Sequence, residues 1–368
     1  MVRPVKTTRV TVRPAARLGL GVIVTMLAIL GVGCPCARGP VNASPGLRWW
    51  LFSNFGASKI CPEMVKRGVG LKLQDNGAAV GRFFPTGCNV DVDNQNQLVT
   101  VHFTGTGYAF TPVSRRVGFR CTASVQYRPD FYLGEDDIYV WGKVNRIVNG
   151  PNFELGYVEN KLADVATSLT PLGGLATTFG NQIVAGELTR GFTVVQSWGT
   201  ESNSFALGIL MPPVKPSGPF DVSQDQRYTF ANEATEVQPY QRDFLGPFEI
   251  VDGTQQLILK MQLQGPAIDV MVVTKAVGDF WREGYQLGQP LGPPPGPVVA
   301  GAPLLPGPQV QSSYQLLPGF YYVVLDNTPY AGQVVPPPPS LLDPLGLPLG
   351  LGSAAAARVS YTVQLAER

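Results

Sequence analysis

Short runs in which apolar and polar residues alternate recur along most of this chain of 368 residues. The period of two is the pattern of a β-strand that buries one face. It is found in residues 99–104, 119–127, 138–144, 257–264 and 359–365. Gly (42) and Pro (34) are abundant and favour turns over long helices. The sequence therefore predicts a mainly β fold, and 44% hydrophobic residues suffice for its core.

The length favours two domains. We expect residues 58–212 to form an α+β domain, in which a curved antiparallel sheet is joined by one or two helices. A Pro-rich break follows residue 212. Residues 213–368 are then expected to form a β-sandwich or jelly-roll domain. Its two Pro-rich insertions, 290–308 and 336–348, are predicted to lack fixed structure.

The N-terminus has the pattern of an export signal. A basic stretch without acidic residues precedes the uncharged run Leu18–Val32, and small residues follow. We therefore predict a signal peptide over residues 1–33 and a tether over 34–57. The alternatives are an uncleaved membrane anchor and an ordinary signal peptide that is cut near Ala37 or Ala43.

Residues Gly31-Val32-Gly33-Cys34 resemble the lipobox of bacterial lipoproteins. The resemblance implies cleavage before Cys34, acylation of this cysteine and a lipid anchor in a membrane. It also implies export to the bacterial cell envelope, at the outer membrane or the periplasmic face. The lipobox prefers Leu three residues before the cysteine, where this chain has Gly31.

The other four cysteines are disulfide candidates, as export would allow. With Cys34 acylated, an even number remains, and Cys61–Cys88 is the favoured pair among three connectivities. Cys121 shares the apolar face of its predicted strand and is expected in the core, free or bridged. The four candidates are Cys36, Cys61, Cys88 and Cys121.

The order of elements in residues 58–212 resembles small bacterial lipoproteins of the tubular lipid-binding superfamily. The resemblance rests on residues 80–85, on the predicted strands and on a helix predicted from Val158 to Leu169 by its apolar spacing. It implies an apolar cavity between helix and sheet that holds a lipid or another apolar small molecule. The candidate lining residues are Val101, Phe103, Phe119, Val125, Val158, Leu162, Val165 and Leu169.

Residues 316–328 have the pattern L-x-P-G-x-Y-x-V-x-x-D-N. It resembles a strand of the jelly-roll domains appended to secreted bacterial proteins, including the pre-peptidase C-terminal type. Such domains serve many hosts, so the resemblance implies a sandwich and no particular activity.

Catalytic and metal-binding signals are few. His102 is the single histidine, which leaves one candidate for any Ser-His or Cys-His pair and disfavours histidine metal sites. It lies on the polar face of its predicted strand. The acidic clusters at 91–96 and 135–137 are expected to be turns, not calcium sites. A formal charge of +2 shows no bias toward nucleic acid. We therefore expect no metal, cofactor or nucleic-acid partner.

These observations favour an exported, membrane-anchored lipoprotein that is not an enzyme and that binds a lipid or another apolar ligand. Two other functions stay open. One is a structural or adhesion protein of the envelope that binds a protein or glycan partner. The other is a hydrolase whose site the sequence does not reveal.

Overall fold

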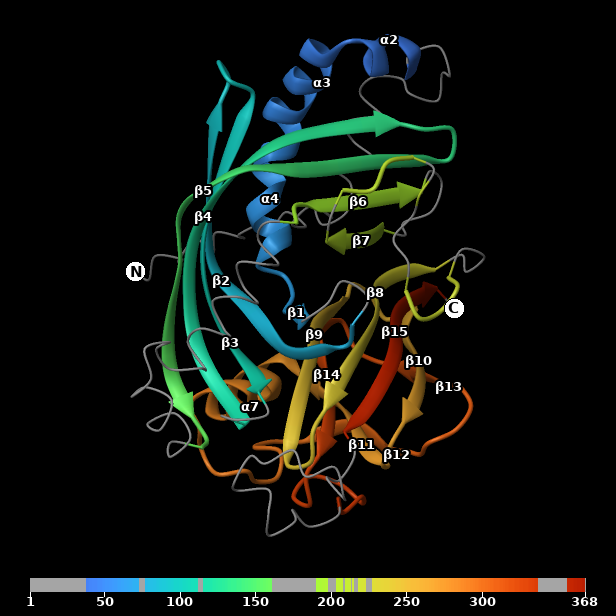
Figure 1. The fold of residues 1–368 in the computed structure, drawn as a ribbon. Helices are drawn as coiled ribbons and strands as arrows, with labels where there is room; N and C mark the ends of the chain where they lie inside the picture. The colour runs from blue at the N-terminus through green and yellow to red at the C-terminus, as the bar shows by residue number, and fades with distance from the viewer. Residues whose placement is uncertain are drawn as a thin grey trace, which may run out of the picture.

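The computed structural model describes residues 38–72, 77–111, 115–160, 190–197, 203–207, 209–212, 214, 218–222, 227–336 and 356–367 (Figure 1). The predicted mainly β fold is confirmed. Two sheets, of eleven and four strands, hold most of the described residues. Among these residues, no helix combines the length and the apolar character needed to span a membrane.

Long antiparallel strands dominate the N-terminal half, and β2 to β5 pair in chain order. The two faces of β3 differ: Val99, Val101 and Phe103 point into the core, while Thr100 and His102 lie on the opposite face. This division follows the sequence period of two. The strands are β1 (Val69–Lys72), β2 (Ala79–Asp93), β3 (Leu98–Thr111), β4 (Arg115–Leu133), β5 (Asp137–Val158), β6 (Phe192–Ser197) and β7 (Asn203–Leu207).

The helix predicted to begin at Val158 does not begin there. Val158 is the last residue of β5, because the pairing of β4 with β5 extends to Val117 and Val158. The other residues of the predicted helix, Leu162, Val165 and Leu169, lie outside the described residues.

Residues 38–57, expected to belong to a tether, are helical and pack on the sheet. Phe52 and Ala57 are buried against Val99, Val101 and other residues of the inner sheet face. Ser44 caps the second helix by accepting a hydrogen bond from the backbone N–H of Leu47 at 3.3 Å. The segments are α2 (Arg38–Ala43), α3 (Pro45–Leu51), a π-helical turn η2 (Phe52–Gly56) and α4 (Ala57–Met64).

The C-terminal half confirms the predicted sandwich. Its two sheet faces enclose a core that includes Leu257, Val272, Val323 and Tyr361. The pattern of alternation in β10 predicted the buried face of that strand correctly. The strands are β8 (Tyr228–Val237), β9 (Gln241–Ile250), β10 (Gln255–Gln264), β11 (Ile268–Thr274), β12 (Val298–Leu304), β13 (Val310–Gln315), β14 (Gly319–Asn327) and β15 (Ala357–Glu367).

One Pro-rich insertion is partly ordered, contrary to the prediction for 290–308. Within it, β12 pairs with β11 in antiparallel register, for example Val270 with Ala302. Proline is tolerated here because β12 is an edge strand of its sheet. Of the second insertion, residues 337–348 lie outside the described residues.

The larger sheet runs through both halves of the chain, in the order β13-β10-β15-β8-β2-β3-β4-β5-β6-β7, and β1 pairs with β2. The link between the halves is narrow, since β2 and β8 pair at Ala79 and Thr235 alone. Helix α7 (Lys275–Gln286) lies beside β3, β4 and β14 (Figure 1). The predicted domain boundary at residue 212 stays a prediction.

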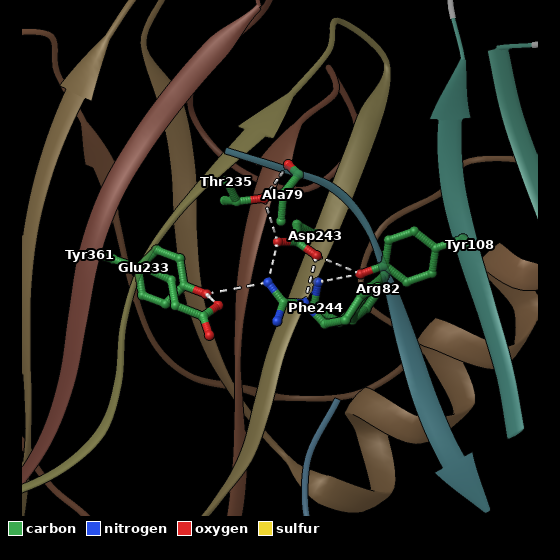
Figure 2. A network of polar contacts seen from close by, with 8 residues as sticks. All are labelled: Ala79, Arg82, Tyr108, Glu233, Thr235, Asp243, Phe244 and Tyr361. Carbon is green, nitrogen blue, oxygen red and sulfur yellow. Dashed lines mark hydrogen bonds and ion pairs between the residues drawn. The ribbon is translucent and has the colours of Figure 1, made fainter. Parts of the chain in front are cut away.

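A buried ion pair strengthens this narrow link (Figure 2). Arg82 of β2 donates through Nε and Nη2 to the two carboxylate oxygens of Asp243 in β9, at 3.0 and 2.8 Å. The hydroxyls of Tyr108 and Thr235 donate to the same carboxylate at 2.6 and 2.9 Å. Burial alone raises the pKa of Asp243, but Arg82 and these hydrogen bonds outweigh burial and hold the pKa below its ordinary value.

A second branch of the network reaches β15. Arg82 Nη2 also donates to the hydroxyl of Tyr361 at 3.3 Å, and that hydroxyl donates to Glu233 at 3.0 Å. Five strands, β2, β3, β8, β9 and β15, thus contribute to one polar cluster. Since a buried charge that loses its partner is costly, the cluster makes the packing of the halves depend on Arg82 and Asp243 together.

Candidate active site

The single histidine lies at the centre of a polar group on the outer face of the long sheet. His102 of β3 stands directly opposite Ser124 of β4. Asp91 of β2 is paired with Thr100, so it lies diagonal to His102 on the same face. Three neighbouring strands therefore bring an aspartate, a histidine and a serine together.

The distances in this group are those of direct hydrogen bonds. His102 Nδ1 is 2.7 Å from Ser124 Oγ, and His102 Nε2 is 2.9 Å from Asp91 Oδ2. An ionised carboxylate can only accept, so the imidazole proton belongs on Nε2. Nδ1 is then left with a lone pair that accepts the hydroxyl hydrogen of Ser124. The carboxylate thus sets the tautomer in which the imidazole can act as a base toward the serine.

Exposure to solvent falls along the group from the acid to the hydroxyl. The side chain of Asp91 is 68% exposed and that of His102 38%, whereas residue Ser124 is 9% exposed. Ser124 as a whole is therefore nearly buried in the sheet, while the imidazole that would exchange protons reaches water. Exposure of Asp91 weakens its electrostatic effect on the ring through solvent screening.

The pairing of β4 with β5 is irregular around Ser124. The register shifts on both sides of this residue, and Ser124 is paired with Asn149. The extra residues are in β5, where the peptide bond between Gly150 and Pro151 is cis. Bulges of this kind re-aim side chains and are frequent beside active sites.

A fixed amide lies next along β4 on the same face. Gln126 is paired with Thr100 on one side and Arg146 on the other. Its Oε1 accepts from Asn145 Nδ2 at 2.8 Å and from Arg146 Nε at 3.2 Å, and its Nε2 donates to Thr100 at 3.4 Å. The two donors hold the carboxamide beside the serine.

The acidic cluster at 91–96 is a turn only in part: Asp91 and Asp93 belong to β2 and the turn follows at 94–97, while 135–136 form the turn before β5, as expected. Asp93 accepts hydrogen bonds from the backbone N–H of Gln95 and Asn96 and from the Asn96 side chain, which lower its pKa. The backbone N–H of Gly134 donates to the backbone carbonyl oxygen of Asp137 at 2.8 Å and closes the other turn. Within the described ranges, no group of three or more His, Cys, Asp or Glu residues could hold a metal ion.

The cysteine predictions have three outcomes. The Cys61–Cys88 disulfide is confirmed, and it ties α4 to β2. Cys121 is free and buried, so its predicted place in the core is confirmed and, of the two alternatives for it, the disulfide is wrong. Its side chain is buried beside Phe119 in an apolar cluster, and burial raises its pKa to about 11, so it is no nucleophile at neutral pH. Cys34 and Cys36 lie outside the described residues.

The residues predicted to line a lipid cavity are distributed over packed side-chain clusters. Val101, Phe103 and Val125 pack against Phe52 and its neighbours, and Phe119 belongs to a separate cluster. A cavity beside Tyr108 and Asp243, at the junction of the halves, has a volume of about 10 Å³, which is room for one water molecule. The remaining lining candidates are Val158, which ends β5, and Leu162, Val165 and Leu169, which are not among the described residues.

The sequence signals at Ser124 and Asp91 are indirect. The sequence offers His102 as the single histidine for a Ser-His pair and predicts that it lies on the polar face of its strand. A serine on the polar face of the next strand could have been noted as well. The pairing register that places Ser124 and Asp91 beside His102 could not be read from the period of two.

Comparisons with known proteins identify no relative by sequence. No family model matches the chain, and no curated protein does. One similar solved structure is a glycoside hydrolase family 43 arabinoxylan arabinofuranohydrolase from Bacillus subtilis, with 10% identity and a TM-score of 0.22. The match covers 76% of this chain and 66% of that protein. Another is a glycoside hydrolase family 32 β-fructofuranosidase from Bombyx mori, with 8% identity, a TM-score of 0.14 and coverage of 77% and 80%.

One expectation from the sequence is corrected. Both solved structures are described as hydrolases. The expectation of a non-enzymatic lipoprotein that binds an apolar ligand is not retained, because those of its candidate cavity residues that the structure describes in β3 and β4 pack against other side chains. At these TM-scores the matches carry no argument for a glycosidase activity or for a shared fold, so function is argued below from the residues alone.

Proposed function

We propose that this protein is a serine hydrolase of carboxylic esters, with Ser124 as nucleophile, His102 as base and Asp91 as the residue that orients the base. The observation that carries the proposal is the position of His102, which is hydrogen-bonded to Ser124 through Nδ1 and to Asp91 through Nε2. A hydroxyl, an imidazole and a carboxylate in this order are the parts of a catalytic triad.

In the proposed reaction, Ser124 Oγ attacks the carbonyl carbon of the ester while His102 Nδ1 takes the hydroxyl proton. The tetrahedral intermediate collapses as the bond to the alcohol breaks, and His102 gives its proton to the departing oxygen. Water then attacks the acyl-serine by the same proton route and releases the acid. Asp91 stabilises the imidazolium formed in each half.

The ring nitrogens have exchanged roles relative to the serine proteases, in which Nε2 faces the serine. At either ring nitrogen the exchanged proton or the lone pair that accepts it lies in the plane of the imidazole ring, so the proton transfer itself is equivalent.

The negative charge that develops on the carbonyl oxygen needs a donor. Asn149 is exposed and is the partner of Ser124 in β5. We assign the side-chain amide of Asn149 as the donor to this oxygen. The irregular pairing of β5 at Asn149 would set the position of this amide relative to Ser124.

The proposal is tested by hydrolysis of 4-nitrophenyl acetate and butyrate. Ser124→Ala and His102→Asn should each lower kcat about 10³-fold or more, to the rate without enzyme. Asp91→Asn should lower kcat about 10- to 100-fold, because Asp91 is exposed and its effect is screened. The matched control is Thr122→Val on the same strand and face, which should retain the wild-type rate. Equal rates in wild type and Ser124→Ala would refute the proposal.

A further inference from the structure

We infer that the substrates of this site carry a negative charge, and that Arg146, which is paired with the residue ~7 Å along β4 from Ser124, selects them by binding a carboxylate on the acyl chain. The inference rests on the proposed function for the identity of the reacting bond. It names the substrate class: esters of dicarboxylic acids, or other esters with a carboxylate on the acyl side.

The position of Arg146 follows from the register. Ser124 and Gln126 are two residues apart on β4, which corresponds to ~7 Å along the strand. Arg146 is the β5 partner of Gln126. Its Nε donates to Gln126 Oε1 at 3.2 Å. One edge of the guanidinium is thereby held at Gln126, two residues along β4 from the serine, and Nη1 and Nη2 remain for a ligand.

Two further cationic side chains lie on the same sheet face, farther from Ser124 than Arg146. Arg128 and Lys143 are paired with each other across β4 and β5, and both are exposed. In the part of the chain that the structure describes, neither they nor Arg146 form an ion pair with a carboxylate. Asp130, the nearby acid on β4, is engaged by Arg48 at 2.7 Å. The three cations thus form a surface of uncompensated positive charge.

The acidic side of the site is at the opposite end of the same row of residues. Asp91, Thr100, Gln126 and Arg146 succeed one another across β2, β3, β4 and β5. Three strand spacings separate the first from the last, or ~14 Å. Ser124, two residues from Gln126 on β4, therefore lies between the carboxylate on β2 that serves His102 and the guanidinium of Arg146 on β5.

The planar fork of arginine matches the two oxygens of a carboxylate. An acyl chain of four or five carbons spans the distance from the acylated serine to the guanidinium. A neutral ester of the same length would gain nothing from Arg146. Because the surface is open to water, the preference should be moderate and should weaken with added salt.

The experiment compares two probes of equal chain length, the 4-nitrophenyl monoester of succinic acid and 4-nitrophenyl butyrate. The ratio of their kcat/KM values should exceed one at low salt and fall about fivefold in Arg146→Gln, as expected for one exposed charge contact. The matched control is Arg120→Gln, which removes the same charge from the same face of β4 on the other side of Ser124. Its ratio should equal that of wild type.

A binding measurement separates this inference from the proposed function. Monomethyl succinate should bind Ser124→Ala about fivefold more tightly than it binds the double variant Ser124→Ala, Arg146→Gln. If wild type hydrolyses neither probe but this binding difference is found, the hydrolase proposal fails and the anion preference stands. Equal binding to both variants, or a ratio that falls equally in Arg120→Gln and Arg146→Gln, would overturn the inference.

Discussion

Replacing Asp243 by Asn should destabilise the whole protein, although the two side chains have nearly the same shape. The Asp243 carboxylate accepts four hydrogen bonds, two from Arg82 and one each from Tyr108 and Thr235, all between 2.6 and 3.0 Å. The Asn variant leaves the guanidinium of Arg82 buried without a counter-charge. Losing one partner of a buried pair costs about 3–5 kcal/mol of unfolding free energy.

The assay is urea unfolding followed by circular dichroism. With a slope of about 3 kcal/mol per M, the midpoint should fall by about 1–1.7 M. Arg82→Met should have a similar cost, because it leaves the carboxylate alone. The double variant should cost clearly less than the sum of the two, since it removes both charges. Additive costs, or a cost below about 1 kcal/mol for either single change, would refute this reasoning.

The lowered pKa of Asp243 gives the same variant a pH signature. A carboxyl whose pKa is lowered by folding contributes stability above its unfolded value of about 4, and this stability is lost as pH falls through the folded value. Wild type should therefore lose stability steeply below about pH 4, and Asp243→Asn less steeply. Equal slopes in acid would show that the carboxylate is not ionised in the folded state.

Three further predictions concern the cysteines and α7. The thiol of Cys121 should not react with a disulfide reagent in the native protein at pH 8. After unfolding in urea, Cys121 should contribute one reactive thiol per chain. Fast reaction of this thiol in the native protein would contradict its burial. Replacing Cys61 and Cys88 by Ala should lower the unfolding free energy by about 3 kcal/mol, as the loop closed by their disulfide predicts, and no change in the urea midpoint would contradict this. Gly118→Ala would place its Cβ 1.8 Å from the carbonyl oxygen of Gln286, so α7 must shift. We expect the unfolding free energy to fall by about 1–3 kcal/mol in the urea assay. An unchanged urea midpoint would show that α7 can move at no cost in stability.

The strands were the predictable part of the fold. In β10, Leu257, Leu259, Met261 and Leu263 alternate with residues that are polar except for Ile258, and all four are buried in the core. A strand of this kind can be predicted from its own residues, because successive side chains point to opposite faces and one face must be buried. The sandwich followed from several such strands in the C-terminal half.

Helices were harder to predict because their signals are short. Gly and Pro in residues 38–57 indicated a tether, yet Pro45 stands at the first turn of α3 after the Ser44 cap, where proline is favoured. In α7, Val277, Trp281 and Tyr285 recur every fourth residue, but the two glycines of that helix weaken the pattern. Packing against the sheets stabilises both segments, and packing is not a local property.

The candidate site required information that a single sequence does not contain. His102 could be identified because it is the single histidine. Its partners are 11 and 22 residues away, and only the register of β2, β3 and β4 brings them within hydrogen-bond distance. The same holds for Arg82 and Asp243, which are 161 residues apart.

The central claim is that Ser124 is an activated nucleophile, and covalent labelling tests it most directly. Wild-type protein is treated with a fluorophosphonate, which reacts with activated serines, and is then digested for mass spectrometry of its peptides. We predict one adduct on Ser124 in wild type and loss of that adduct in His102→Asn, with unchanged circular dichroism in both. Absence of an adduct on Ser124, or equal labelling of Ser124 in the two proteins, would contradict the account.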